Sequence, residues 1–281
     1  VRLVIISQLV PAEALSSAAR LNATSYNLSR VLGPAIVGVL IAGFGADWSL
    51  AANPPTFVPL MLVFYTIRLI PRERGSDTHE PLLKSILEGM RYARRDRIIR
   101  WCLIVAATSA LFTRGVLEII PVIVGQLLAG DRALLATITA ACGGGAIVAS
   151  VITSAIIPSH ANAKKVTSLA AIGGALAIVL VGLVPSMPTA LIAFTIASFC
   201  ATLSAINSQT LVYGFAHSAY RARTLTWWST FSLGASAGGG VVMSLLAEFA
   251  ALHTLVIGAG LLAFCSAAAL YVRRPATPQA G

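Results

Sequence analysis

Long apolar segments separated by short basic connections are the feature that most limits what this chain can fold into. A helix needs about 20 apolar residues to cross the hydrocarbon core of a bilayer. Eight segments reach that length, at about residues 21–44, 50–70, 98–128, 133–157, 166–184, 189–213, 224–246 and 252–272. Because lipid cannot hydrogen-bond to backbone groups, this pattern predicts an all-α, polytopic membrane helix bundle.

The composition agrees with a membrane protein and excludes other classes. Of the 281 residues, 57% are hydrophobic and 11% are charged, whereas a soluble domain carries about 25% charged residues. The net charge of +10 could indicate nucleic-acid binding, but the basic residues lie in the connections between apolar segments. There they determine topology, so we expect a lipid bilayer and no nucleic acid as partner.

The placement of Lys and Arg predicts how the chain is oriented in the membrane. Sixteen of the twenty lie in connections on one side, whereas Arg132 alone lies on the other. The positive-inside rule assigns the basic side to the cytoplasm. We therefore expect a multi-pass protein of the plasma (inner) membrane with a cytoplasmic C-terminus.

An internal repeat divides the chain into related parts. The stretch from Arg20 to Trp48 aligns without gaps with that from Arg221 to Phe249, at an offset of 201 residues. Such a repeat in a membrane protein suggests two related halves. We expect residues 1–70 to be the remainder of an N-terminal six-helix half, 71–97 a cytoplasmic linker, and 98–281 a C-terminal six-helix half. About eight of twelve spans are then present.

The linker contains one segment with its own periodicity. Apolar residues recur at helical spacing and alternate with basic ones between residues 82 and 95. This pattern predicts a short amphipathic helix. It could lie on an anionic membrane face or pack on the inner surface of the protein itself, and the two alternatives are compatible.

Motifs in both halves carry a resemblance to a known family. They are Leu9-Val10-Pro11, Leu21-Asn22, Asn27-Leu-Ser-Arg30-Val-Leu-Gly33-Pro34, Asn53, Phe57, Asn207, Gln209 and Arg221-Ala-Arg223. With the two halves and the basic linker, they resemble the major facilitator superfamily. The likeness is greatest to its bacterial exporter branch, which includes enterobactin exporters and macrolide efflux proteins. The chain departs from that family by lacking the first four spans.

The resemblance implies a secondary active transporter that works by alternating access. It implies an antiporter that couples proton entry to efflux of amphipathic small molecules of the drug or siderophore type. A truncated, inactive or partner-dependent half-transporter remains an alternative, as does, with less support, a membrane-embedded lipid-modifying enzyme. The sequence has no nucleotide-binding loop, metal-ligand cluster or nucleophile triad. We therefore expect no enzyme, and no cofactor, metal or nucleotide.

Arg30 is the first candidate site residue because a charge inside a lipid-spanning segment is costly. Tyr26, Asn27 and Arg30 share a helix face at i, i+1 and i+4 spacing with Gly33 and Pro34 beyond them. Such a polar face suits substrate binding or gating in a cavity between the halves. A structural arginine that caps carbonyls or pairs with a carboxylate is the alternative.

Arg114 and Glu118 are the candidates for proton coupling. They are four residues apart in the segment 98–128, so they can pair on one helix face. Uptake of a proton by Glu118 would then release Arg114. A permanently paired structural bridge is the alternative.

Three further patterns concern the last helices. Asn207 and Gln209 could contact substrate, or Asn207 could bond a neighbouring helix. Trp227 and Trp228 are expected at the membrane interface, where tryptophan is common. Gly234 and Gly238 form a small-xxx-small pair that predicts close helix packing.

Overall fold

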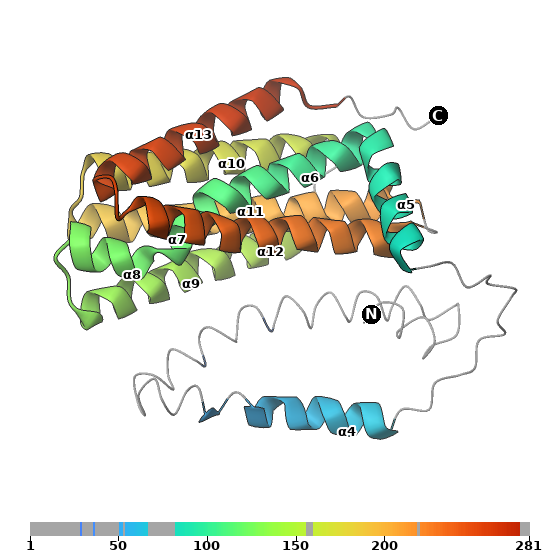
Figure 1. Ribbon diagram of the computed structural model, residues 1–281, viewed down its shortest axis with the longest axis horizontal. Helices are drawn as coiled ribbons and strands as arrows, with labels where there is room; N and C mark the ends of the chain where they lie inside the picture. Colours follow the sequence, from blue (N-terminus) through green and yellow to red (C-terminus); the bar gives the residue numbers. More distant parts are fainter. Residues whose placement is uncertain are drawn as a thin grey trace, which may run out of the picture. The chain divides into compact units, whose positions relative to one another are not determined.

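The computed structural model describes residues 29, 36, 51–52, 54–66, 82–155, 160–217 and 220–275, and every element within these ranges is helical (Figure 1). The chain divides into two units, residues 1–80 and 81–281. The predicted division at residues 70 and 97 into half, linker and half remains a prediction.

The longest described stretch of the first unit is one short apolar helix. It begins with the 3₁₀ turn η2 (Pro54–Phe57) and continues as α4 (Val58–Thr66). Proline is tolerated in the first turn of a helix, where its missing N–H has no intrahelical partner. The pair Pro54-Pro55 therefore begins this helix, within the predicted span 50–70.

The second unit contains six helical segments that are long and apolar enough to cross a membrane. The first runs from residue 97 to residue 127 in several pieces. The others are α9 (Arg132–Ala155), α10 (His160–Leu183), α11 (Met187–Phe215), α12 (Arg221–Leu246) and α13 (Leu252–Val272). The six spans predicted for residues 98–272 are thus confirmed.

The first of these segments is not a regular helix. It consists of α6 (Arg97–Ser109), the π-turn η3 (Ala110–Arg114), α7 (Gly115–Glu118), α8 (Ile120–Val122) and the π-turn η4 (Ile123–Leu127). Pro121 cannot donate to the carbonyl four residues back. The chain instead tightens at Ile119, whose N–H donates to the Val116 carbonyl over 3.2 Å. The helix is therefore interrupted just before Pro121.

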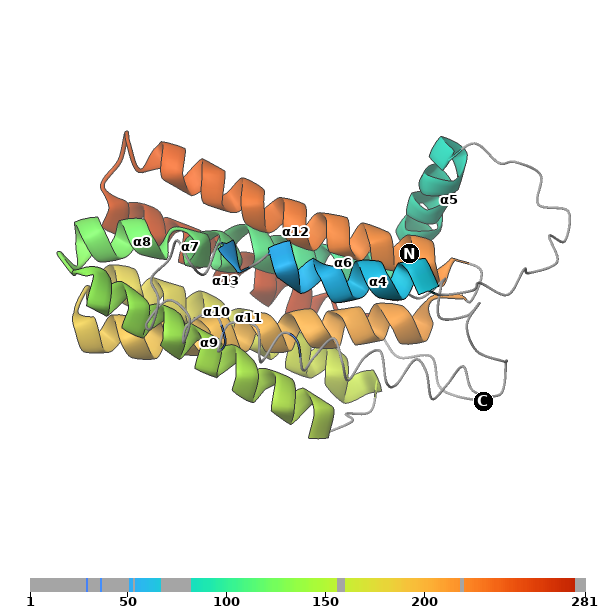
Figure 2. The same ribbon diagram turned by 90° about the horizontal axis from the view of Figure 1, so that it is seen from below.

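The six segments run lengthwise beside one another (Figures 1 and 2). Helix α10 packs against α11 and α13, α9 against α11, and α12 against α6 and α7. One apolar core surrounds Phe194, Ile178 and Val256. A second core, around Ile99 and Trp101, lies toward the start of α6. Close packing of these side chains holds the helices together.

The predicted amphipathic helix is present as α5 (Leu82–Arg95). It lies across one end of the bundle in both views (Figures 1 and 2). Glu88 of α5 pairs with Arg223 of α12, and the Tyr92 ring stacks on the Tyr220 ring with centroids 4.7 Å apart. Helix α5 thus packs on the protein's own surface, one of its two predicted environments.

Candidate functional site

The predicted site residues of the first half lie outside the described residues. These are Tyr26, Asn27 and Arg30, so their role in substrate binding or gating stays a prediction. The candidate site is therefore built from the second unit, where the other four predicted residues lie.

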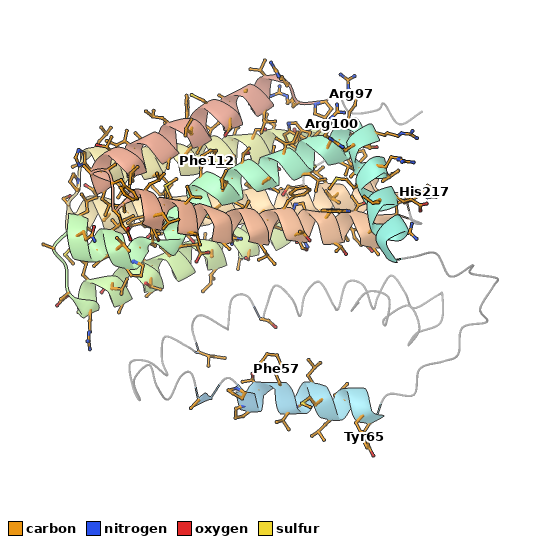
Figure 3. The ribbon with its side chains drawn as sticks, viewed as in Figure 1. Phe57, Tyr65, Arg97, Arg100, Phe112 and His217 are labelled. Atoms are coloured by element: carbon orange, nitrogen blue, oxygen red, sulfur yellow. The ribbon has the colours of Figure 1, made fainter. Side chains whose placement is uncertain are left out.

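The π-turn η3 places Arg114 at its end, immediately before the short helix α7. Arg114 is half-buried, and Glu118, at the other end of α7, is exposed. Figure 3 labels Phe112 on the same turn, well away from the end that carries α5. A π-turn inside an α-helix frequently marks a functional position because it re-aims the side chains around it.

Glu118 is tied to α12 by a hydrogen bond. The Ser236 hydroxyl donates to Oε1 of Glu118 over 3.0 Å, and Ser236 itself is 6% exposed. At 1.5 Å per residue, Glu118 lies about 30 Å along the segment from Arg97. The segment continues to Leu127, so Glu118 lies in the half of the segment that is away from α5.

Helices α7 and α12 touch through their backbones beside this hydrogen bond. A Cβ atom added to Gly239 would collide with the Leu111 carbonyl oxygen, and one added to Gly115 would lie 3.0 Å from the Gly239 backbone. One added to Gly240 would lie 3.1 Å from Cβ of Glu118. Only glycine allows this approach, which places Ser236 within reach of the carboxylate.

Among the described residues, the glycine pair singled out in the sequence has no close neighbour. At Gly234 and Gly238, no described atom lies within 4 Å of an added Cβ. The close contact belongs to Gly239, one residue further along. A small-xxx-small spacing shows that one helix face carries only small side chains. Gly234 and Gly238, however, lie on a face turned away from the described neighbours.

A small polar cavity adjoins Arg114. Its volume is about 10 Å³, and Arg114, Ser109, Ser204 and Ser232 line it together with four alanines. This space is enough for one water molecule, and three hydroxyls supply the hydrogen-bond partners that a buried water requires. The cavity brings an arginine and three serines from α6, η3, α11 and α12 to one place.

The two predicted polar residues of α11 differ in their environment. Asn207 is 3% exposed, whereas Gln209 is half-buried. Residues two apart point in different directions from a helix, so the two do not form one polar face. Their predicted contact with substrate is not tested by this arrangement.

Trp228 packs inside the second unit, and its expected place at the membrane interface stays a prediction. Its side chain is 7% exposed, and its Nε1 donates to the Ser208 hydroxyl of α11 over 3.2 Å. Trp227 is half-buried and lies beside Gly89 of α5. Both tryptophans therefore pack within the second unit, because the start of α12 is covered by α11 and α5.

The residues that sequence reasoning missed are Ser232, Ser236, Gly115 and Gly239. Ser232 and Ser236 are four residues apart and both buried, so they share the face of α12 that meets the first segment. This serine spacing within an apolar helix is the signal that could have identified them. The described ranges contain no group of three or more His, Cys, Asp or Glu that could hold a metal ion.

Comparison with known proteins adds a family and a fold. The model of the family described as transmembrane secretion effector matches residues 3–280. No curated protein sequence matches the chain significantly.

Two solved structures share the fold. One is a bacterial homolog of the human lysosomal transporter Spinster, in an inward-facing and unoccupied conformation. It is 15% identical with a TM-score of 0.58, over 96% of this chain and 73% of that chain. The E. coli fucose:proton symporter is 14% identical with a TM-score of 0.57, over 98% of this chain and 72% of that chain.

Proposed function

Because the chain belongs to the transmembrane secretion effector family of the major facilitator superfamily, we propose that it is a secondary transporter that couples proton entry to efflux of amphipathic small molecules. Transport proceeds by alternating access, in which the two halves of such a transporter rock about a central site. The motifs shared with bacterial exporters support the direction of transport. The fold shared with a proton symporter agrees with coupling to protons.

The observation that carries the proposal is the contact of Glu118 with Ser236. An ionisable residue within a membrane segment faces protein or water, and such residues often form proton relays. An ionised carboxylate only accepts hydrogen bonds, whereas a protonated one can also donate. Protonation of Glu118 therefore changes the hydrogen bonding between α7 and α12 at the point where their backbones touch.

Arg114 links this change to the polar cavity. It lies one helical turn before Glu118, a spacing at which opposite charges attract. Loss of the Glu118 charge weakens that attraction. The Arg114 guanidinium can then interact with the serines that line the cavity. In this proposal the cavity, together with Arg30, Tyr26, Asn27, Asn207 and Gln209, belongs to the pathway of the substrate.

The position of Glu118 suits proton entry from outside the cell. The positive-inside rule assigns the end with α5 to the cytoplasm, and Glu118 lies in the half of the segment that is away from α5. A carboxylate there can exchange protons with the external solution. The protein would then work in the plasma membrane, with protons and an amphipathic substrate as its small-molecule partners.

The test is substrate accumulation in cells at two external pH values with Glu118→Gln. We expect the variant to lose the dependence of efflux on external pH, because the amide cannot be ionised. Glu248→Gln is the matched control, since Glu248 is an exposed carboxylate just after α12. Full pH dependence in Glu118→Gln, with normal amounts of protein in the membrane, would exclude Glu118 as the coupling group.

A further inference from the structure

Lys164 is the most deeply buried cation among the described residues of the second unit. Its side chain is 2% exposed, and Nζ donates to the Pro275 carbonyl oxygen over 2.8 Å. An ammonium group has three donors, and a buried charge is costly unless it is paired. Within the described ranges no carboxylate forms a salt bridge with Lys164.

The groups around Lys164 add positive charge. Arg274 lies within electrostatic range of Lys164 and places its guanidinium 4.3 Å from the centre of the Tyr271 ring. Lys165 and Arg273 are exposed beside them. Asp96 also lies at this end of the bundle, but its Oδ1 accepts from the Ile98 and Ile99 N–H groups. Four cations therefore gather at the ends of α10 and α13.

An apolar surface continues from this cluster along α10. Leu169, Leu176 and Leu180 are exposed and lie on the same helix face as Lys165, at spacings of four, seven and four residues. On α13, Val272 is exposed immediately before Arg273. A basic cluster above an apolar face at the cytoplasmic end of membrane helices fits a phospholipid, with its phosphate on the cations and its chains along the leucines.

We propose that Lys165, Arg273 and Arg274 bind the phosphate of an anionic phospholipid, with the buried charge of Lys164 adding to the positive field at the site and Leu169, Leu176 and Leu180 contacting the acyl chains. The site lies at the end of the bundle where α5, Arg97, Arg100 and His217 also lie (Figure 3). It is independent of the coupling residues, which lie toward the other end. The lipid supplies a counter-charge for Lys164, with which no carboxylate of the described residues forms a salt bridge.

The test is native mass spectrometry of the purified full chain in detergent, titrated with dioleoyl-phosphatidylglycerol. We expect saturable binding that is at least tenfold tighter than binding of dioleoyl-phosphatidylcholine. Glycerol phosphate at the same concentration should not displace the lipid. Displacement by glycerol phosphate would show that the site binds free phosphate rather than a lipid. Equal affinity for the two lipids would show that the site does not select a negative charge. Either result overturns the proposal.

Charge-matched variants locate the site. Lys165→Gln/Arg273→Gln/Arg274→Gln should weaken phosphatidylglycerol binding more than tenfold, since each exposed charge contributes about fivefold. Arg91→Gln/Arg94→Gln/Arg95→Gln removes three exposed charges from α5 and should weaken it less than threefold. Equal weakening by both triples would show a diffuse electrostatic effect and overturn the site. Lys165→Gln alone replaces an exposed side chain and should preserve folding. It should still weaken phosphatidylglycerol binding about fivefold.

Discussion

Glu88 on α5 forms a salt bridge with Arg223 on α12, with 3.1 Å between Oε2 and Nη1. The contact joins the helix that precedes the six-span unit to the start of its fifth span. Gly89 allows the approach, because an added Cβ there would lie 2.8 Å from Cβ of Arg223. The stacked rings of Tyr92 and Tyr220 lie beside it, inclined by 11°.

The salt bridge is expected to stabilise this junction less than the stacked rings do. The Glu88 and Arg223 side chains are 31% and 35% exposed, and ion pairs of this kind contribute about 0–1 kcal/mol. An aromatic pair contributes about 0.5–1.5 kcal/mol beyond the area it buries. Double-mutant cycles in detergent, with Glu88→Gln/Arg223→Gln and Tyr92→Leu/Tyr220→Leu, should give the larger coupling energy for the tyrosines. A salt-bridge coupling above 2 kcal/mol would contradict this order.

Gly239→Ala should destabilise the protein, because the added methyl group meets the Leu111 carbonyl oxygen. Overpacking of this kind costs about 1–3 kcal/mol. Gly238→Ala is the control: no described atom lies within 4 Å of its added Cβ, and alanine is the better helix former by up to about 1 kcal/mol. Thermal unfolding of both variants in one detergent should give a lower Tm for Gly239→Ala alone.

Ser236→Ala should slow the transport proposed above without unfolding the protein. The change removes the hydroxyl that donates to Glu118, and a hydrogen bond to a charged group contributes about 1.5–3 kcal/mol. We expect about a tenfold loss in transport rate and an altered pH profile. Ser244→Ala, at an exposed position of the same helix, should leave both unchanged. Identical pH profiles for the two variants would remove Ser236 from the coupling site.

Asp96→Ala should weaken the start of the first span. The Asp96 carboxylate caps α6 by accepting from the Ile98 and Ile99 N–H groups, each over 2.9 Å. Loss of such a cap costs about 0.5–2 kcal/mol. Asp96→Asn keeps the capping oxygen and should retain most of the stability. Equal unfolding temperatures for Asp96→Ala and the wild-type chain would show that the cap contributes little.

The number and place of the spans in the second unit were predictable because apolar length alone identifies a membrane helix. The amphipathic helix was predictable because its two faces differ in polarity. The contacts of α12 were not, because they depend on how that helix is rotated against α7. Small and apolar residues occur on every face of α12. Nothing in the local sequence therefore distinguishes Gly239 from Gly238 or indicates that Trp228 points inward.

Glu118 illustrates the same limit at the site. Its position inside a long apolar segment identified it as a functional candidate without any structure. Its partner Ser236 is 118 residues further along the chain, and that pairing follows only from the packing of two helices. The π-turn before it was equally hidden: one extra residue shifts the spacing of apolar side chains by one position, but a segment that is apolar on almost every face does not reveal that shift.

The two π-turns also determine where the first span can change its length. Each π-turn holds one residue more than an α-helical turn. Deletion of one residue within Ala110–Arg114 would convert that turn to an α-helical one and leave Glu118 opposite Ser236. The same deletion within α6 would fall in a regular α-helical turn. It would rotate the rest of the span by about 100° about the helix axis. Within the first span, tolerance to single-residue deletions should therefore be confined to these two turns.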